Sequence, residues 1–289
     1  MVEQVRLAES LWRTTAARLW RRRGARVALC VVAGLVLVAC LGPWLSPWKP
    51  DRLDWNHLAQ APGAAGAHWL GTDRLGRDLY VRTLHGVRLS LVLSVVASGL
   101  SLLIGITWGA LAGFAGGRID GWMMRFVDVL YALPYLFIVI ILTSLFARGS
   151  LIVLIAGLGG VGWLTTARIV RGQTLALKGR EFIDAARATG VASPQIVLTH
   201  IVPNLLGPVL VYAALTIPQM ILFESFLSFL GLGVQEPQAS LGNLIYGGAQ
   251  EMESAPWMLM VPAAVLVMLL LCLNALGDSL RDALDPREH

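Results

Sequence analysis

Two carboxylates stand out in this sequence because each lies inside a long apolar segment. Asp128 lies within Phe126–Phe146 and Glu224 within Leu205–Leu230, and neither segment contains another charged residue. A lone charge in an apolar environment is costly, so such a residue usually faces a wet cavity or a polar partner. Each carboxylate therefore has two candidate roles: it belongs to a polar pathway or gate, or it is the structural partner of another polar group.

The neighbours of these two residues in the sequence favour different roles. Arg125 stands three residues before Asp128, and an ion pair at that helical spacing favours a structural role for Asp128. Glu224 has no basic neighbour in the sequence, although Pro218 would free backbone groups one to two turns away. Both roles stay open for Glu224.

A second concentration of charge separates two apolar segments between residues 168 and 208. Its basic residues are Arg168, Arg171, Lys178, Arg180 and Arg187. Within it, Glu181–Thr189 predicts a short helix, because Gly190 follows as a C-terminal stop. We expect Gly190 to adopt a positive φ, a conformation that other residues resist.

The short helix presents two different faces. Glu181, Asp184 and Arg187 share one face, and Phe182, Ala185 and Ala186 share another. A second helix, Gln195–Val202, is predicted because Ser193-Pro194 supplies an N-cap and a first helical proline. Two capped helices predict docking against another protein. A DNA-binding helix-turn-helix is disfavoured because the segment is nearly charge-balanced and is tethered at both ends.

Enzyme motifs are absent from the sequence. Its two lysines, Lys49 and Lys178, precede proline and glycine, so a Gly-Lys-Ser/Thr phosphate loop cannot form. The glycines of Gly157–Gly162 lie in an apolar segment without the strand that a dinucleotide loop needs. The cysteines, Cys30, Cys40 and Cys272, lack metal-like spacing. We therefore predict no catalytic, cofactor or metal site in this chain.

The composition indicates what must position these residues. Of 289 residues, 56% are hydrophobic and 14% are charged, and the mean hydropathy is +0.67. Soluble domains carry about 25% charged residues, so the chain is predicted to be an all-α integral membrane protein. Six segments are long and apolar enough to span a bilayer: Val27–Leu45, Leu89–Ala115, Phe126–Phe146, Leu151–Ala167, Leu205–Leu230 and Trp257–Leu276.

The basic residues orient these spans. With both termini in the cytoplasm, sixteen basic residues lie inside and seven outside, as the positive-inside rule requires. The predicted organisation is a basic cytoplasmic N-terminus (1–26), a first span (27–47), an external loop (48–88), a core (89–277) with a cytoplasmic loop (168–204), and a cytoplasmic tail (278–289). The external loop is unusually basic, and we expect Asp78–Arg88 to form an interfacial helix. The seven arginines before residue 27 could also form a nucleic-acid arm, but the adjacent span favours a topology anchor.

The cytoplasmic loop resembles a known motif. Asp184-Ala185-Ala186, Gly190 and Ile201-Val202-Pro203 resemble the EAA loop of ABC importer permeases. The flanking segments resemble the C-type permease of oligopeptide and dipeptide importers: Gly71–Leu91, Ala167–Ala186, Ile221–Pro237 and Gly277–Pro286. Two positions depart from the wider family pattern. Asp184 stands where the family usually has glutamate, and His200-Ile201-Val202-Pro203 replaces Ile-x-Leu-Pro.

This resemblance implies a fold and a set of partners. The fold would be that of a type I ABC importer permease, with a five-helix core plus an N-terminal helix. The ATPase-coupling residues would be Glu181, Phe182, Asp184, Ala185, Ala186, Arg187, Gly190 and Pro203. The chain would pair with a sister permease in the inner or plasma membrane, with two cytoplasmic ATPases that bind ATP and Mg²⁺. An external binding protein would deliver the cargo, and no nucleic acid is expected.

Oligopeptides are the expected cargo, because Ile169–Phe182 and Ile221–Pro237 look most like the oligopeptide branch. Dipeptides, nickel chelates or another small solute remain alternatives. A different class, a proton-coupled secondary transporter using Asp128 and Glu224, should show inverted repeats, and none is evident. A membrane enzyme would need a convergent set of nucleophile, base or metal ligands, which the sequence does not present.

Overall fold

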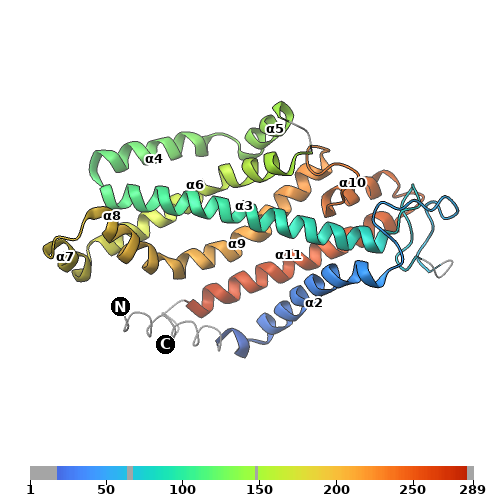
Figure 1. Cartoon of the computed structure of the whole chain (residues 1–289), viewed down its shortest axis with the longest axis horizontal. Helices are drawn as coiled ribbons and strands as arrows, with labels where there is room; N and C mark the ends of the chain where they lie inside the picture. The colour runs from blue at the N-terminus through green and yellow to red at the C-terminus, as the bar shows by residue number, and fades with distance from the viewer. Residues whose placement is uncertain (1–17, 64–67, 147–148, 285–289) are drawn as a thin grey trace.

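The computed structural model describes residues 18–63, 68–146 and 149–284. Long helices lie side by side along the longest dimension, with short helices and a loop at opposite ends (Figure 1). The elements are α2 (Arg23–Leu45), α3 (Leu79–Ala115), α4 (Gly117–Ala132), α5 (Tyr135–Leu145), α6 (Leu151–Lys178), α7 (Glu181–Ala188), α8 (Ser193–Ile196), a π-helical turn (Val197–Ile201), α9 (Val202–Phe229), α10 (Leu241–Gln250) and α11 (Trp257–Leu284). Four basic residues used to predict the topology, Arg6, Arg13, Arg148 and Arg287, lie outside the described residues.

The predicted spans correspond to these helices. Five of them, α2, α3, α6, the α8–α9 unit and α11, are long and apolar enough to cross a membrane, and the bent pair α4–α5 would make a sixth. The prediction of an all-helical membrane protein is therefore confirmed, with five helices that can span and a sixth span only if α4 and α5 count as one. Many apolar side chains on α2 and α11 are exposed, including Leu37 and Leu271, as expected for helices whose outer faces meet lipid or another subunit.

The third predicted span is not one helix. The segment Phe126–Phe146 is divided between α4 and α5, whose axes differ by 79°. The break lies at Leu133, which is extended with ψ 137°, and at Pro134, with φ −63°. A proline removes a backbone donor and pushes the preceding residue out of the helical region. Pro134 therefore separates two helices within this segment.

Three helices extend beyond their predicted limits. The external loop was predicted to reach residue 88, but α3 already begins at Leu79, where Asp78 caps it by accepting a hydrogen bond from the Val81 N–H at 2.8 Å. The residues expected to form a separate interfacial helix are the buried first turns of α3. Likewise α6 continues to Lys178 and α11 to Leu284, so the cytoplasmic loop and the tail are shorter than predicted. In each extension some side chains are buried against neighbouring helices. The polar residues of these segments did not indicate that the helices continue.

The centre of the bundle is the close packing of α3 on α6. A Cβ atom at Gly109 would lie 2.4 Å from the carbonyl oxygen of Ala167, and one at Gly105 would lie 2.5 Å from the Cβ of Thr166. Only glycine allows these backbones to approach so closely. Gly105 and Gly109 therefore set the close contact between α3 and α6.

Candidate functional site

The short helix predicted at Glu181–Thr189 is present as α7, at one end of the molecule (Figure 1). It ends at Ala188, Thr189 is the C-cap, and Gly190 follows with φ 80°. The Val191 N–H donates to the carbonyl of Ala186 at 3.1 Å, and the Gly190 N–H donates to that of Arg187 at 3.0 Å. The left-handed glycine thus closes the helix as predicted.

One face of α7 is buried against the spans. Ile183 is fully buried, and Ala186 is 8% exposed. Both belong to an apolar cluster, here called the α7 cluster, whose other buried members are Ala110, Val170, Ile196, Val197, Ile201, Leu205 and Val209. The cluster joins α7 to α3, α6 and α9. Ala186 therefore packs inside this chain, whereas Phe182 and Ala185, with which it was expected to share a face, are exposed. Ile183, which the sequence analysis did not select, is the central anchor.

The opposite face of α7 points away from the chain. Glu181, Phe182, Asp184, Ala185 and Arg187 are all exposed, and Phe182 is 41% exposed. The guanidinium of Arg187 lies 3.1 Å from the carboxylate of Asp184 and 5.6 Å from the ring centre of Phe114, on α3. A surface with an exposed aromatic ring, small residues and both charge signs can bind a protein partner, which is the role predicted for these residues.

The second predicted helix does not stand alone. Residues 193–229 form one continuous helical unit of α8, the π-helical turn and α9. Ala192, rather than Ser193, occupies the N-cap position, and no side chain caps it. The π-helical turn ends at Ile201, two residues before Pro203. Pro203 is exposed and has no N–H to donate to the carbonyl of Thr199. We attribute the π-helical turn to this missing donor.

Two basic residues of α6, Arg171 and Lys178, form hydrogen bonds with other helices. Arg171 donates from Nε and Nη2 to the two oxygens of Asp120 at 2.5 and 2.6 Å. Lys178 donates from Nζ to the carbonyl of Phe114, at the end of α3. These contacts fasten the end of α6 to α3 and α4. The positive charges that predicted a loop therefore lie on a helix.

Asp128 is paired, but not with the predicted residue. Arg168 of α6 donates from Nη2 to Asp128 Oδ1 at 2.8 Å and lies 4.1 Å from the ring centre of Tyr131. The expected partner, Arg125, is not the one found. Asp128 and Arg168 are 54% and 40% exposed in their side chains, so this is a pair at the surface of the chain. A partner 40 residues away could not be identified from local spacing.

Glu224 lies on α9, and its side chain is fully buried against α3. Its carboxylate accepts hydrogen bonds from the hydroxyls of Ser90 at 2.7 Å and Ser228 at 2.8 Å. Hydroxyl donors offset part of the cost of burying the carboxylate. Neither partner suggested by the sequence, an arginine or backbone freed by Pro218, is the one seen.

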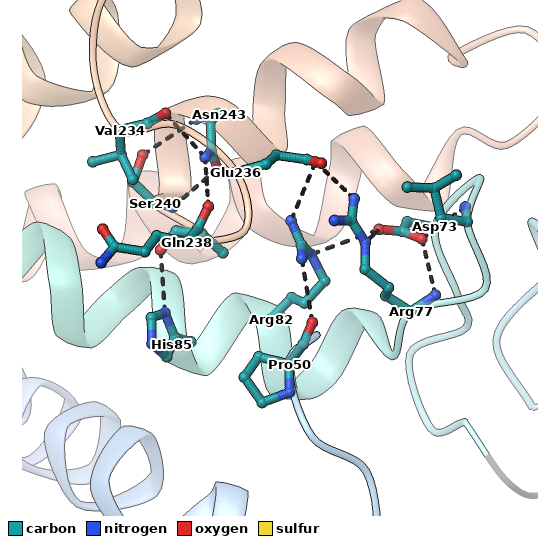
Figure 2. A network of polar contacts seen from close by, with 12 residues as sticks. Pro50, Asp73, Arg77, Arg82, His85, Val234, Glu236, Gln238, Ser240 and Asn243 are labelled. Carbon is teal, nitrogen blue, oxygen red and sulfur yellow. Dashed lines mark hydrogen bonds and ion pairs between the residues drawn. The ribbon is translucent and has the colours of Figure 1, made fainter. Parts of the chain in front are cut away.

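A polar network that the sequence did not predict lies at the other end of the bundle (Figure 2). Arg77 donates to Asp73 at 2.6 Å and to Glu236 at 2.7 Å, and Arg82 donates to the carbonyl of Pro50 at 3.2 Å. Arg82 is 2% exposed and lies 3.6 Å from Asp73 and 3.7 Å from Glu236. The network joins the loop before α3 to the segment between α9 and α10, which is 159 residues away in sequence.

The charges of this network stabilise one another. The hydrogen bond from Arg77 holds the pKa of Glu236 below its ordinary value, although partial burial opposes this shift. Burial disfavours the charged form of Arg77, yet its bonds to Glu236 and Asp73 outweigh that effect and raise its pKa. Arg77 and Glu236 therefore stabilise each other's charged forms.

Two protein-family models match different parts of this chain. Residues 105–289 match the family model of binding-protein-dependent transport system inner membrane components. Residues 10–62 match the N-terminal transmembrane domain of oligopeptide transport permease C. The first match begins within α3 and includes α7 and the α7 cluster.

Several curated proteins are similar over nearly the whole chain. The oligopeptide transport system permease protein OppC of Haemophilus influenzae is 46% identical over 289 residues, which is 100% of this chain and 93% of that protein. OppC of Escherichia coli K12 is 48% identical over 97% of this chain and 92% of that protein. The dipeptide transport system permease protein DppC of Bacillus subtilis is 41% identical over 96% of this chain and 85% of that protein.

A solved structure shares the fold. An inward-facing structure of the MetNI methionine ABC transporter matches 71% of this chain and 96% of its own chain, with a TM-score of 0.56 and 21% identity. At that identity the likeness concerns the arrangement of helices alone. It confirms the type I importer permease fold expected from the sequence.

Proposed function

The chain belongs to the family of binding-protein-dependent transport system inner membrane components, and we propose that it is the permease subunit of an ATP-driven importer of oligopeptides. The observation that carries the proposal is identity of 46–48% to oligopeptide permeases over 97–100% of the chain. The dipeptide permease is 41% identical, so oligopeptides are preferred over dipeptides, nickel chelates or another small solute.

ATP and Mg²⁺ would bind to partner subunits, because this sequence contains no phosphate loop. We infer that α7 docks on a cytoplasmic ATPase through Glu181, Phe182, Asp184, Ala185 and Arg187. The proposal is supported by the exposure of these side chains and by the place of α7 at the end of the bundle (Figure 1). Gly190 and Pro203 would then shape the backbone behind the docking face.

We propose that the buried face of α7 transmits its motion to the spans. Ile183 and Ala186 pack against residues of α3, α6 and α9. Close-packed apolar clusters resist compression and transmit displacement. When two ATPases close on ATP, a docked α7 would move with its ATPase and carry these three spans with it. This is a switch between two packed states, biased by ligands at separate sites.

Transport also requires partners in and outside the membrane. We propose a sister permease that forms the cargo path together with this chain, two ATPases, and an external binding protein that delivers the peptide. In the conformation described here Glu224 holds α3 to α9 through Ser90 and Ser228. We assign Glu224 a locking role between these spans and Asp128 a structural pairing role, rather than a place in an open path.

The orientation follows from charge and geometry together. Arg22, directly before α2, pairs with Asp282, near the end of α11. The start of α2 and the end of α11 lie toward the α7 end of the molecule (Figure 1). If α7 binds a cytoplasmic ATPase, both termini are cytoplasmic. The arginines before α2 support this assignment by the positive-inside rule. The protein would then be a multi-pass component of the inner or plasma membrane.

A reconstituted complex tests the cargo and the energy source. We would purify the chain with its partners from mildly solubilised native membranes, insert the complex into vesicles, and supply the binding protein. Labelled tetra- and pentapeptides should accumulate with ATP, and should not accumulate with a non-hydrolysable analogue. Preferential uptake of dipeptides or chelated nickel would overturn the oligopeptide assignment. Uptake driven by a proton gradient without ATP would overturn the importer assignment.

A further inference from the structure

Three metal-ligating side chains converge in the loop between α2 and α3. Asp54, His57 and His68 each offer a ligand atom, and these atoms lie within 4.8 Å of one another. The cluster lies outside the network of Figure 2 and has no role in the transport proposal. No metal site was predicted from the sequence, because its cysteines lack metal-like spacing.

His68 is oriented as metal-binding histidines are. Its side chain is fully buried, and its Nδ1 lies 2.8 Å from Asp78 Oδ2. Asp78 can only accept, and its Oδ1 already accepts from the Val81 N–H, so the His68 proton belongs on Nδ1. A carboxylate that holds Nδ1–H in this way leaves the Nε2 lone pair free for a metal ion.

That lone pair has no hydrogen-bond partner among the described residues. Instead, His68 Nε2 faces Asp54 Oδ2 at 3.6 Å, which is beyond hydrogen-bond distance. Two electron-rich atoms therefore face each other in a mostly dry site, since Asp54 is 14% exposed. A cation between them would remove both the repulsion and the unsatisfied buried nitrogen.

The distances suit a small tetrahedral ion. Two ligands about 2.0–2.2 Å from a tetrahedral zinc ion lie about 3.3–3.6 Å apart, which matches the separation of His68 Nε2 and Asp54 Oδ2. His57 Nδ1 donates to Asp54 Oδ2 at 2.8 Å, and its side chain is 34% exposed. His57 can therefore exchange this hydrogen bond for a metal ligand, and its exposed side gives the ion a route of entry.

We propose that Asp54, His57 and His68 bind a divalent transition-metal ion of the zinc class, with Asp78 orienting His68. Two imidazoles and one carboxylate match the ligand preferences of Zn²⁺ and leave a fourth position for water. The ion would tie both halves of the loop to Asp78, the cap of α3. The proposal rests on this geometry alone and stands whether or not the chain imports peptides.

The competing explanation is a metal-free cluster, in which a doubly protonated His68 lies between Asp54 and Asp78. The two explanations differ in whether the purified chain binds zinc through His57. We would purify the full chain without a polyhistidine tag, strip it with chelator, and titrate it with Zn²⁺ against a chromogenic competitor. One high-affinity ion per chain is expected.

Variants locate the ion. His57→Gln and Asp54→Asn should abolish the high-affinity site, and Asp78→Asn should weaken it about 10–100-fold. His200→Gln, in the π-helical turn at the opposite end, is the matched control and should bind like the wild type. His57 is the preferred test because its side chain is partly exposed, so its loss leaves the buried packing intact.

Cobalt gives a readout that does not depend on affinity alone. Co²⁺ in the wild type should show the intense visible absorption of four-coordinate cobalt, and His57→Gln should lose it. Wild-type chain that binds no zinc in the micromolar range would overturn the proposal. Equal zinc affinity in the wild type and His57→Gln would also overturn it, because the ion would then lie elsewhere.

Discussion

The two ends of this molecule are held together by different forces. At the α7 end, one short helix is anchored by the apolar α7 cluster, with Ile183 and Ala186 inside and charges outside. At the loop end, formed by residues 46–63 and 68–78, the start of α3 and residues 230–250, buried Arg77 hydrogen-bonds two carboxylates and buried Arg82 lies within 3.7 Å of both. Apolar packing is non-directional, whereas charged hydrogen bonds fix geometry. The apolar α7 cluster can therefore carry α3, α6 and α9 along with α7, whereas the ion pairs of the loop end hold its segments in one fixed geometry.

The largest effect is expected at Gly190, where φ is 80°. Gly190→Asp should abolish peptide uptake, because strain of roughly 1–3 kcal/mol at this position would displace α7. Gly190→Asn is the matched control, since asparagine tolerates the left-handed conformation better and carries no charge. Membrane insertion should be unchanged in both variants. Wild-type uptake by Gly190→Asp would show that the geometry of α7 does not matter.

At the loop end we expect a large loss of stability rather than of coupling. Asp73→Asn removes a carboxylate that faces both Arg77 and Arg82, leaving two nearby positive charges with Glu236. Breaking a buried pair in this way costs about 3–5 kcal/mol. The measurement is thermal unfolding of the detergent-solubilised chain. Glu253→Gln, at an exposed position, is the control, and an equal unfolding temperature in the two variants would contradict the network.

A middle-sized effect is expected between the two ends, at Glu224. Glu224→Leu would leave the hydroxyls of Ser90 and Ser228 without their buried acceptor, at a cost of about 1–3 kcal/mol. Glu224→Gln keeps an acceptor oxygen and should be closer to the wild type. Unfolding in increasing concentrations of a denaturing detergent would compare the stability of the wild type and the two variants. A leucine variant as stable as the wild type would contradict the role of Glu224 in holding α3 to α9.

The smallest effect is expected at the rim of the network. Glu236 is 55% exposed, so its pairing with Arg77 should contribute no more than about 1 kcal/mol. Because Arg77 holds the pKa of Glu236 below its ordinary value of 4.5, this contribution is complete above that pH and is lost as the pH falls through the lower pKa of the folded state. The stability difference between wild type and Glu236→Gln should therefore be constant at neutral pH and vanish in acid. A difference that persists in acid would exclude this ion pair as its source.

The same contrast explains what could be predicted from the sequence. The spans, α7 and the conformation of Gly190 follow from local apolar patterning and a local stop signal, and the structure confirms them. The partner of Asp128, the hydrogen bond that Ser90 donates to Glu224 and the ion pair of Arg77 with Glu236 each depend on residues far apart in the chain. No local pattern identifies them. The helix limits at Leu79 and Lys178 were missed for a related reason, since burial against a neighbouring helix, rather than residue type, sustains those turns.

The central claim is that the exposed face of α7 binds an ATPase while the buried face transmits its motion. Ala185, on the exposed face, and Ala186, on the buried face, are adjacent and identical in type, so they allow a direct test. The measurement is the amount of ATPase that co-purifies with Ala185→Trp from mildly solubilised membranes. We predict a folded permease at wild-type level with most of the ATPase lost, whereas Ala186→Trp should destabilise the permease itself. ATPase retained by Ala185→Trp in the wild-type ratio would contradict the claim.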